Sequence, residues 1–272
     1  LLPLIQFHLF LFQFTDTSYL HLIEAAGDLL SVTTNKRNGG TFARRSTEPE
    51  IMDDLQYAGT MMDQTLKELE VINRWLGGNE VTLDALSRIV DGTNNQELQI
   101  ADLGCGRGDM LRHIHRWAVR KRRSVTLTGI DANPYIIEAA RRNLADLTVD
   151  LQAINILSKE FKGMEFDVVI GTLFYHHFSD EELIALFSEL RSQCRLGFII
   201  NDIHRHPLAY YSIKFLTRIF SKSDMVKYDA PLSVLRAFAK QDLQNILRLA
   251  GCNHYTIKWR WAFRWQICVF TR

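Results

Sequence analysis

From residue 98 to residue 200, short apolar runs alternate with longer segments in which apolar residues recur at helical spacing. The short runs have the length of buried strands, whereas the longer segments have the period of amphipathic helices. Strands and helices in alternation are typical of a parallel sheet covered by helices. The pattern therefore predicts an α/β fold with a Rossmann-like sheet. We expect its strands at about 98–103, 125–130, 148–154, 166–170 and 196–200.

The end of the chain has a different pattern, in which apolar and polar positions alternate strictly. The alternation runs from Tyr255 to Phe263 and again from Trp265 to Val269. A period of two residues is typical of half-buried strands. We therefore expect a C-terminal antiparallel hairpin that turns near residues 262–264, in addition to the five parallel strands.

The segment before the first strand, residues 48–95, has the pattern of two helices. Apolar residues recur at helical spacing from Ile51 to Leu76, and Gly77 follows as a stop signal. A second helix is expected at about residues 82–90. We expect the segment to form a helical cap over a ligand cleft, and packing against the sheet alone is the alternative.

The first 47 residues are unlike the rest of the chain. Residues 1–14 are apolar, but about 20 apolar residues are needed to span a bilayer, and no basic leader precedes them. Residues 33–46 contain few large apolar side chains and have the composition of a flexible linker. We expect residues 1–47 to lie outside the native fold; a short packing or membrane-surface helix is the alternative for the apolar part.

Composition narrows the class of protein. The chain has 272 residues, 47% of them hydrophobic and 23% charged, which suits one large globular domain, or one domain with an appendage. A formal net charge of +1 gives no electrostatic reason to expect a nucleic acid as partner. The spacing of the four cysteines favours neither a zinc site nor a disulfide framework, and we expect a cytoplasmic protein. They are Cys105, Cys194, Cys252 and Cys268.

The most informative stretch is IADLGCGRGD, residues 100–109. It predicts a buried strand, a tight turn with Gly104, Gly106 and Gly108, and a helix that starts directly after them. Glycine is needed where the backbone bends sharply or approaches a ligand closely. The N-terminus of the helix leaves backbone N–H groups unpaired. We therefore expect a nucleotide-like ligand over this turn.

Two acidic residues indicate the kind of ligand. Asp102 precedes the first glycine by two residues, and Asp131 ends the second strand in the stretch LTGIDANP. A carboxylate beside the turn suits a ligand with a cationic amine better than one with a pyrophosphate. An acidic residue at the end of the second strand can accept hydrogen bonds from both hydroxyls of a ribose. The glycine spacing GxGxG also differs from the GxGxxG of dinucleotide-binding domains.

The stretch DLGCGRGD, followed by GIDANP and by residues 166–178, resembles the class I S-adenosylmethionine-dependent methyltransferases. The small-molecule branch of this family, with enzymes that act on quinones and other phenols, is the most similar. PLAYY and DAPLSVLRAF also resemble, more weakly, methyltransferases of bacterial aromatic polyketide pathways. The resemblance implies a seven-stranded sheet with an antiparallel last strand, a methyltransferase domain over residues 96–272, and S-adenosyl-L-methionine as cofactor.

The resemblance also implies roles for residues near the cofactor. Asp102 is expected to bind the methionine amino group, and Asp131 the ribose hydroxyls. Asn155 stands where the family often has an acidic residue for the adenine amino group, and an amide can still pair with adenine. Ala132 and Ile156 are expected as apolar walls of the adenine pocket. The full set of expected cofactor-binding residues is Asp102, Gly104, Cys105, Gly106, Gly108, Asp131, Ala132, Asn155, Ile156 and Thr172.

The stretch GTLFYHHFSDEE after the fourth strand lacks the NPPY-like turn of many nucleic-acid methyltransferases, which favours a small-molecule acceptor. His177 in this stretch, and His204 and His206 after the fifth strand, are candidates for a base that takes a proton from a phenolic or hydroxyl oxygen. Helix capping or structural hydrogen bonding is the alternative role. The aromatic-rich insertion at about residues 204–238 is expected to line a pocket for an aromatic or polyketide-like acceptor.

We therefore predict an S-adenosylmethionine-dependent methyltransferase that acts on a small molecule. A nucleic-acid methyltransferase, an NAD-dependent oxidoreductase and a non-catalytic cofactor-binding module are the alternatives. No metal is expected, because His204 and His206 beside Asp202 match no recognised metal-site spacing. The basic run at residues 116–123 is expected to be solvated surface at a helix end, with an RNA-binding patch as the alternative.

Overall fold

The computed structural model describes residues 40–93 and 97–271. The greater part of the predicted N-terminal segment, residues 1–39, lies outside the described residues. The chain divides into two units, residues 1–44 and residues 45–272, and the helices and strands given below belong to the second unit. In the described part of the chain, no helix is both long enough and apolar enough to cross a membrane.

The centre of the fold is a seven-stranded sheet with the strand order β3-β2-β1-β4-β5-β7-β6. The first five strands run parallel to one another, and β7 is antiparallel to both β5 and β6. The predicted α/β sheet with a C-terminal antiparallel hairpin is therefore confirmed. The strands are β1 (Leu98–Leu103), β2 (Val125–Asp131), β3 (Asp150–Ala153), β4 (Phe166–Thr172), β5 (Cys194–Ile203), β6 (Tyr255–Arg260) and β7 (Arg264–Phe270).

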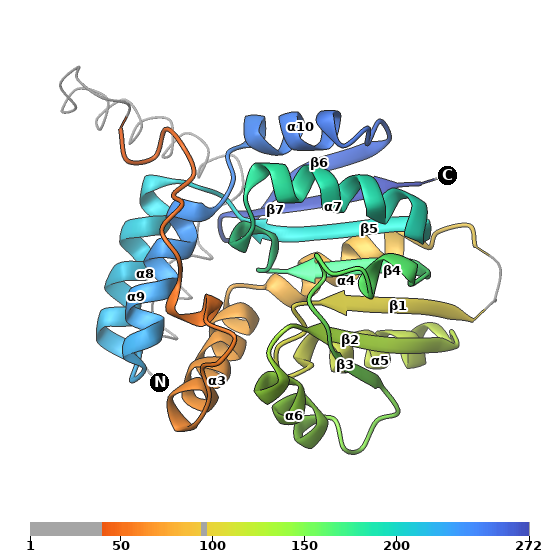
Figure 1. Cartoon of the computed structure of the whole chain (residues 1–272), viewed down its shortest axis with the longest axis horizontal. Coiled ribbons are helices and arrows are strands. Elements are labelled where there is room, and N and C mark those ends of the chain that lie inside the picture. Colours follow the sequence, from red (N-terminus) through yellow and green to blue (C-terminus); the bar gives the residue numbers. More distant parts are fainter. Residues whose placement is uncertain (1–39, 94–96, 272) are drawn as a thin grey trace. The chain divides into compact units, whose positions relative to one another are not determined.

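Helices cover both faces of this sheet (Figure 1). On one face lie α7 (Asp180–Gln193) and α10 (Lys240–Leu249). On the other face lie α4 (Gly78–Ile89), α5 (Asp109–Lys121) and α6 (Pro134–Asn143). Short connections join most strands to these helices, as expected for crossovers between parallel strands.

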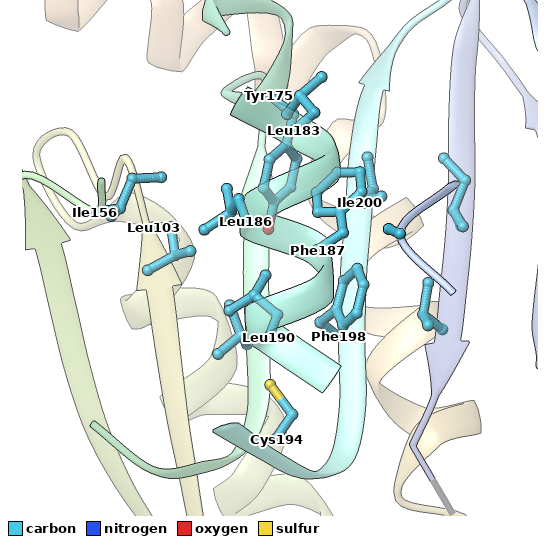
Figure 2. Packing of buried hydrophobic residues seen from close by; sticks show 14 of the residues in the cluster. Leu103, Ile156, Tyr175, Leu183, Leu186, Phe187, Leu190, Cys194, Phe198 and Ile200 are labelled. Carbon is cyan, nitrogen blue, oxygen red and sulfur yellow. The ribbon is translucent and has the colours of Figure 1, made fainter. Parts of the chain in front are cut away.

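Each face of the sheet has its own hydrophobic core. Figure 2 shows the first, in which Leu186, Phe187 and Leu190 of α7 pack against the sheet. The second core packs α4 and α5 against the opposite face. Full burial of one such side chain stabilises the fold by about 1.5–3 kcal/mol. The two cores hold the strands in place, so the carboxyl ends of β1, β2 and β4 occupy fixed positions at one edge.

A third group of helices lies at the carboxyl ends of the parallel strands (Figure 1). It contains α3 (Thr60–Trp75), α8 (Pro207–Phe220) and α9 (Asp224–Arg236). The last two are the aromatic-rich insertion that follows β5. They contact each other, and α9 also contacts α3 and the 3₁₀ turn η1 (Ile51–Asp53). Two further 3₁₀ turns, η2 (Phe161–Gly163) and η3 (Tyr175–His177), flank β4.

The region before the sheet differs from the continuous helix predicted for residues 51–76. The structure has the short turn η1, a break, and then α3, with Gly59 in the break at a φ of 93°. The helix is interrupted because a side chain from α9 accepts hydrogen bonds from backbone N–H groups at this point. Asp229 of α9 accepts hydrogen bonds from the N–H groups of Ile51 and Met52 at 2.8 and 3.1 Å. A tertiary contact thus replaces the first turn of the expected helix.

Candidate active site

The glycine turn joins β1 to α5, as the sequence predicts. Gly104, Gly106 and Gly108 have φ values of 65°, 54° and 79°, a region that residues with a Cβ atom rarely adopt. A Cβ atom on Gly104 would collide with the ring of Phe174, which follows β4. A Cβ atom on Gly106 would meet nothing within 4 Å. The turn is therefore packed on one side and faces open space at Gly106.

Asp131 lies beside this turn at the end of β2. Its Oδ2 atom accepts a hydrogen bond from the N–H of Gly106 at 3.4 Å, and its Oδ1 atom accepts one from the N–H of Asn133 at 3.0 Å. Burial raises the pKa of Asp131 to about 6, although both hydrogen bonds oppose the shift. The carboxylate is thus held next to the open side of the turn, where a diol could reach it.

Asp102 is the second carboxylate of the turn and is almost completely buried, with 2% of its surface exposed. Burial raises its pKa to about 8, and the nearby charges of Asp131 and Asp109 add to the shift. The pKa of Asp109 is also raised, to about 6, mainly by burial. Asp102 is therefore largely protonated at neutral pH; a cationic ligand beside it would favour its ionised form, whereas an anionic pyrophosphate would oppose it.

The remaining residues of the expected cofactor set lie at the same edge of the sheet or close to it. Asn155 is exposed, and its Oδ1 atom accepts a hydrogen bond from the N–H of Leu157 at 2.9 Å, which leaves the amide NH₂ group for a ligand. Ile156 and Cys105 are buried in the two cores. Thr172 ends β4, and its hydroxyl lies 3.0 Å from that of Thr82 in α4. Ala132 is half-buried next to Asp131.

The turn η3 after β4 places two adjacent histidines in different surroundings. The Nδ1 atom of His176 lies 2.7 Å from Oδ1 of Asp202, and the backbone N–H of His176 donates to the other oxygen of Asp202 at 3.2 Å. Burial alone would raise the pKa of Asp202, but the charge of His176 and its hydrogen bond lower it. Both side chains are buried, so this pair holds η3 against the end of β5.

His177 is half-buried and pairs with Asp53 of η1. Its Nδ1 atom lies 2.6 Å from Oδ1 of Asp53, whose Oδ2 atom is 2.6 Å from the guanidinium of Arg236. Burial would raise the pKa of Asp53, but the hydrogen bond and charge of His177 and the charge of Arg236 lower it. The charge of His177 also acts on Asp131 and opposes the rise in its pKa. His177 is therefore bound to η1 and is near enough to the glycine turn for its charge to act on Asp131.

Glu50, next to η1, completes this cluster. Its side chain is 3% exposed, and burial raises its pKa to about 7. One carboxylate oxygen accepts a hydrogen bond from the hydroxyl of Ser233 at 2.9 Å. The other oxygen lies 3.7 Å from Nε2 of His176 and 3.7 Å from Nε of Arg236.

His204 and His206 lie farther along the chain, where β5 meets the hairpin. The backbone N–H of His204 donates to the carbonyl of Phe263 at 2.8 Å. Burial lowers the pKa of the His204 imidazole to about 4. His206 is the N-cap of α8, and its Nδ1 atom accepts a hydrogen bond from the N–H of Leu208 at 3.2 Å. Burial lowers the pKa of His206 as well. Of the three histidines, only His177 acts electrostatically on Asp131 of the glycine turn, whereas His204 and His206 are engaged at the hairpin and at α8.

Sequence reasoning missed Glu50 and Asp53 and did not connect Arg236 to the histidines. These residues precede or follow His177 by 127, 124 and 59 positions in the chain, so no local motif contains them. One signal was present. The pair Glu50 and Asp53 has the spacing of a capping box, and the structure confirms this box at η1. It indicates a turn, although not what the turn would contact.

Comparison with known proteins shows a match between the central part of the sheet and one family of domains. Residues 100–197, from β1 to the first part of β5, match a family model described as a methyltransferase domain. Residues 100–197 are therefore similar to a methyltransferase domain. No curated protein matches the sequence. The predicted class of enzyme is confirmed at this level.

Solved structures with a similar fold include several methyltransferases. The plantazolicin methyltransferase BpumL, in complex with a triazolic desmethylPZN analog and SAH, has a TM-score of 0.57 and 17% sequence identity, over 72% of this chain and 73% of that chain. Human N-acetylserotonin methyltransferase in complex with SAM has a TM-score of 0.54 and 17% identity, over 77% of this chain and 55% of that chain. An O-methyltransferase family protein from Burkholderia thailandensis has a TM-score of 0.54 and 17% identity, over 76% of this chain and 59% of that chain. At this identity, the similarity shows the fold that the methyltransferase domain shares with them.

Proposed function

We propose that this protein is an S-adenosylmethionine-dependent methyltransferase that methylates a phenolic or hydroxyl oxygen of a small molecule. The observation that carries the proposal is the pair of buried carboxylates at the glycine turn. At neutral pH Asp131 is ionised, and Asp102, whose pKa is about 8 without ligand, would ionise next to a bound cation but not next to a pyrophosphate. S-adenosylmethionine brings an ammonium group and a sulfonium instead. The charge of the site therefore favours this cofactor over NAD.

The residues of the turn fit the cofactor. Asp131 receives the ribose hydroxyls, because its carboxylate lies beside the open side of the turn at Gly106. Asp102 balances the ammonium group of the methionine part. Asn155 and Ala132 meet the adenine end. Ile156 and Cys105 support this pocket from the core, because both side chains are buried.

When bound, S-adenosylmethionine supplies a methyl group that the sulfonium already activates, so the protein has to align the acceptor and remove its proton. We place proton removal at His177. Asp53 orients its ring through the hydrogen bond to Nδ1, and the ring lies near the ribose-binding carboxylate. His206 is less suited to this role, because its Nδ1 atom is used to cap α8. His204 is less suited because it is held at the hairpin.

The helical cap of residues 48–95 and the insertion of residues 204–238 enclose the acceptor. The carbonyl of Tyr57 accepts a hydrogen bond at 3.0 Å from the side chain of Asn133, two residues after Asp131. Met62 and Leu66 of α3 pack in one cluster with Ile136 of α6. These contacts bring the cap to the end of β2. The apolar and aromatic side chains of the insertion suit an aromatic or polyketide-like acceptor.

The test is methyl transfer from labelled S-adenosylmethionine to a panel of phenols, quinones and hydroxylated polyketides. We expect a product with the label on oxygen. His177→Ala should lower kcat by roughly 10²–10⁴-fold with little change in the affinity for S-adenosylhomocysteine. His206→Ala should instead lower the stability by about 0.5–2 kcal/mol through the loss of the α8 cap. Binding of the cofactor without transfer to any acceptor would contradict the proposal, as would equal activity of the His177→Ala variant and the wild type.

A further inference from the structure

Three side chains at the end of β4 come together in the manner of metal ligands. One ring nitrogen of His176, one of His177 and one carboxylate oxygen of Glu50 lie within 4.8 Å of one another. Within residues 40–93 and 97–271, no other set of three or more His, Cys, Asp and Glu side chains does so. Glu50 directly precedes η1, whereas the two histidines belong to η3, more than 120 positions later in the sequence.

The two histidines already make the hydrogen bonds that orient metal ligands. Each Nδ1 atom lies within hydrogen-bond distance of a carboxylate, at 2.7 Å from Asp202 for His176 and at 2.6 Å from Asp53 for His177. An ionised carboxylate only accepts, so each Nδ1 atom carries the hydrogen. In a neutral imidazole, the Nε2 atom is then left with a lone pair. Metal-binding histidines typically have this arrangement, with one nitrogen on a carboxylate and the other on the ion.

Glu50 adds a third acceptor. Its Oε1 atom is buried and has no hydrogen-bond partner among the described residues. It faces Nε2 of His176 at 3.7 Å, and this nitrogen also carries a lone pair. Two buried acceptors that face each other are unfavourable unless a cation or a proton lies between them. Since Ser233 binds the other oxygen of Glu50, the Oε1 atom is held in this orientation.

The charges around the cluster favour a cation. Glu50, Asp53, Asp202 and Asp229 lie in it or beside it, whereas the guanidinium of Arg236 contacts Glu50 at 3.7 Å and Asp53 at 2.6 Å. Arg45 also donates to the carbonyl of His176, but its charge is paired with Asp180, so the four carboxyl groups outnumber the arginine charge available to them. Arg236 also fixes the backbone, because it donates hydrogen bonds to the carbonyl oxygens of Glu48, His176 and His177. The ligand atoms are therefore held in place before any ion arrives.

We propose that Glu50, His176 and His177 bind a divalent transition-metal ion next to the cofactor site. Two imidazoles and one carboxylate are a donor set that suits Zn²⁺, Fe²⁺ and Co²⁺ and leaves coordination positions open for a substrate oxygen. The side chain of His177 is 21% exposed, so the cluster can be reached from solvent at this ligand.

The role of this ion rests on the proposed function. An acceptor hydroxyl that binds the ion loses its proton to water more readily. The oxygen then forms its bond to the methyl carbon while the bond from this carbon to sulfur breaks, and the electron pair stays on sulfur. With the ion bound, His177 promotes proton removal as its ligand; without the ion, the His177 ring takes the proton itself, as proposed above.

Cobalt binding to the 272-residue chain tests the site directly. The protein is treated with a chelator, freed of any affinity tag and titrated with Co²⁺, whose visible absorption reports imidazole and carboxylate ligands. We expect saturation at one equivalent. Glu50→Gln keeps the shape of the side chain but removes its charge. His177→Asn removes the imidazole of a half-buried side chain. Each variant should bind Co²⁺ at least about 10-fold more weakly than the wild type. His254→Ala is the matched control, because it removes an exposed histidine outside the cluster.

Circular dichroism and thermal unfolding show whether each variant is folded before its affinity is compared. Binding of Co²⁺ that is equally tight in the Glu50→Gln variant, or no saturable binding by the wild type, would overturn the proposed metal site. The proposed function is tested separately by titration with S-adenosylhomocysteine and by methyl transfer. Methyl transfer that is unaffected by the chelator would remove the role of the ion and leave the methyltransferase assignment. A saturable Co²⁺ site without methyl transfer would support the metal site and remove the methyltransferase assignment.

Discussion

The Oδ2 atom of Asp131 accepts a hydrogen bond from the backbone N–H of Gly106 at 3.4 Å, so the end of β2 is tied to the glycine turn after β1. This contact places the carboxylate where a ribose would lie. We expect Asp131→Ala to weaken binding of S-adenosylhomocysteine by roughly 10–100-fold, the usual effect of losing a hydrogen bond to a charged group. Isothermal titration calorimetry measures the change. Glu138→Ala, which removes an exposed carboxylate from α6, is the control, and equal affinities for the two variants would refute the ribose assignment.

The pKa of Asp131 predicts how cofactor affinity depends on pH. Burial raises this pKa to about 6 in the protein without ligand. The ionised carboxylate accepts hydrogen bonds from both ribose hydroxyls, whereas the protonated form loses part of its acceptor capacity. Affinity for S-adenosylhomocysteine should therefore fall as the pH drops through about 6. Measurements on both sides of this pH should show the fall in the wild type and a flatter profile in Asp131→Asn; the same slope in both proteins would assign the effect to another group.

The buried Asp102 should make the ligand-free protein less stable at higher pH. Its pKa is raised from the usual 3.8 to about 8 by burial and by Asp131 and Asp109, so the folded state holds a proton that the unfolded chain releases. The free energy of unfolding therefore falls as the pH rises from about 4 to about 8. Asp102→Asn should reduce this fall, on the order of 1–3 kcal/mol, while it weakens cofactor binding.

Urea unfolding at several pH values measures this effect of Asp102. The exposed Asp91→Asn is a control for the loss of one carboxylate. If Asp102→Asn were less stable than the wild type at alkaline pH, the buried carboxylate would be stabilised by contacts that offset its desolvation.

Gly106 offers a test of the open side of the turn. A Cβ atom there meets nothing within 4 Å, so Gly106→Ala should fold with a loss of only about 1 kcal/mol from the strained φ of 54°. The methyl group would occupy the space assigned to the cofactor, and binding of S-adenosylhomocysteine should fall by at least about 10-fold. Gly77→Ala is the matched control, because Gly77 has a φ of 70°, equal free space and a place between α3 and α4. Equal cofactor affinity in both variants would place the ligand elsewhere.

The sheet could be predicted from the sequence because its signals are local. Apolar runs gave the positions of the strands, and Asn133 with Pro134, or Ser179 with Glu182, marked helix starts that the structure confirms. The boundaries were less accurate. β5 extends to Ile203, beyond the predicted end at residue 200, because its last residues pair with the beginning of β7. This pairing depends on a strand more than 60 positions away in the sequence.

The polar cluster could be predicted only in part. His177 follows β4 in a stretch that could be identified from the sequence as part of the site. Its partner Asp53 lies 124 positions earlier, in a segment whose pattern predicts a helix. The N–H groups of Ile51 and Met52 in this segment donate hydrogen bonds to Asp229, and the hydrophobic periodicity of the sequence does not predict these tertiary contacts. His204 and His206 were also equal candidates by sequence. Only the cap of α8 and the contact with the hairpin distinguish them from His177.

The hydrogen bonds of Arg236 have a consequence for how this enzyme can change its substrate. This side chain ends α9 and joins the insertion to the backbone of η3 and to Asp53 of η1. Under the proposed function, a change in the insertion that suits a new acceptor also shifts η3 and η1, which carry the proposed catalytic groups. Exchange of the insertion between related enzymes should succeed only when the donor segment brings its own arginine at this position, so substrate range and chemistry are inherited together.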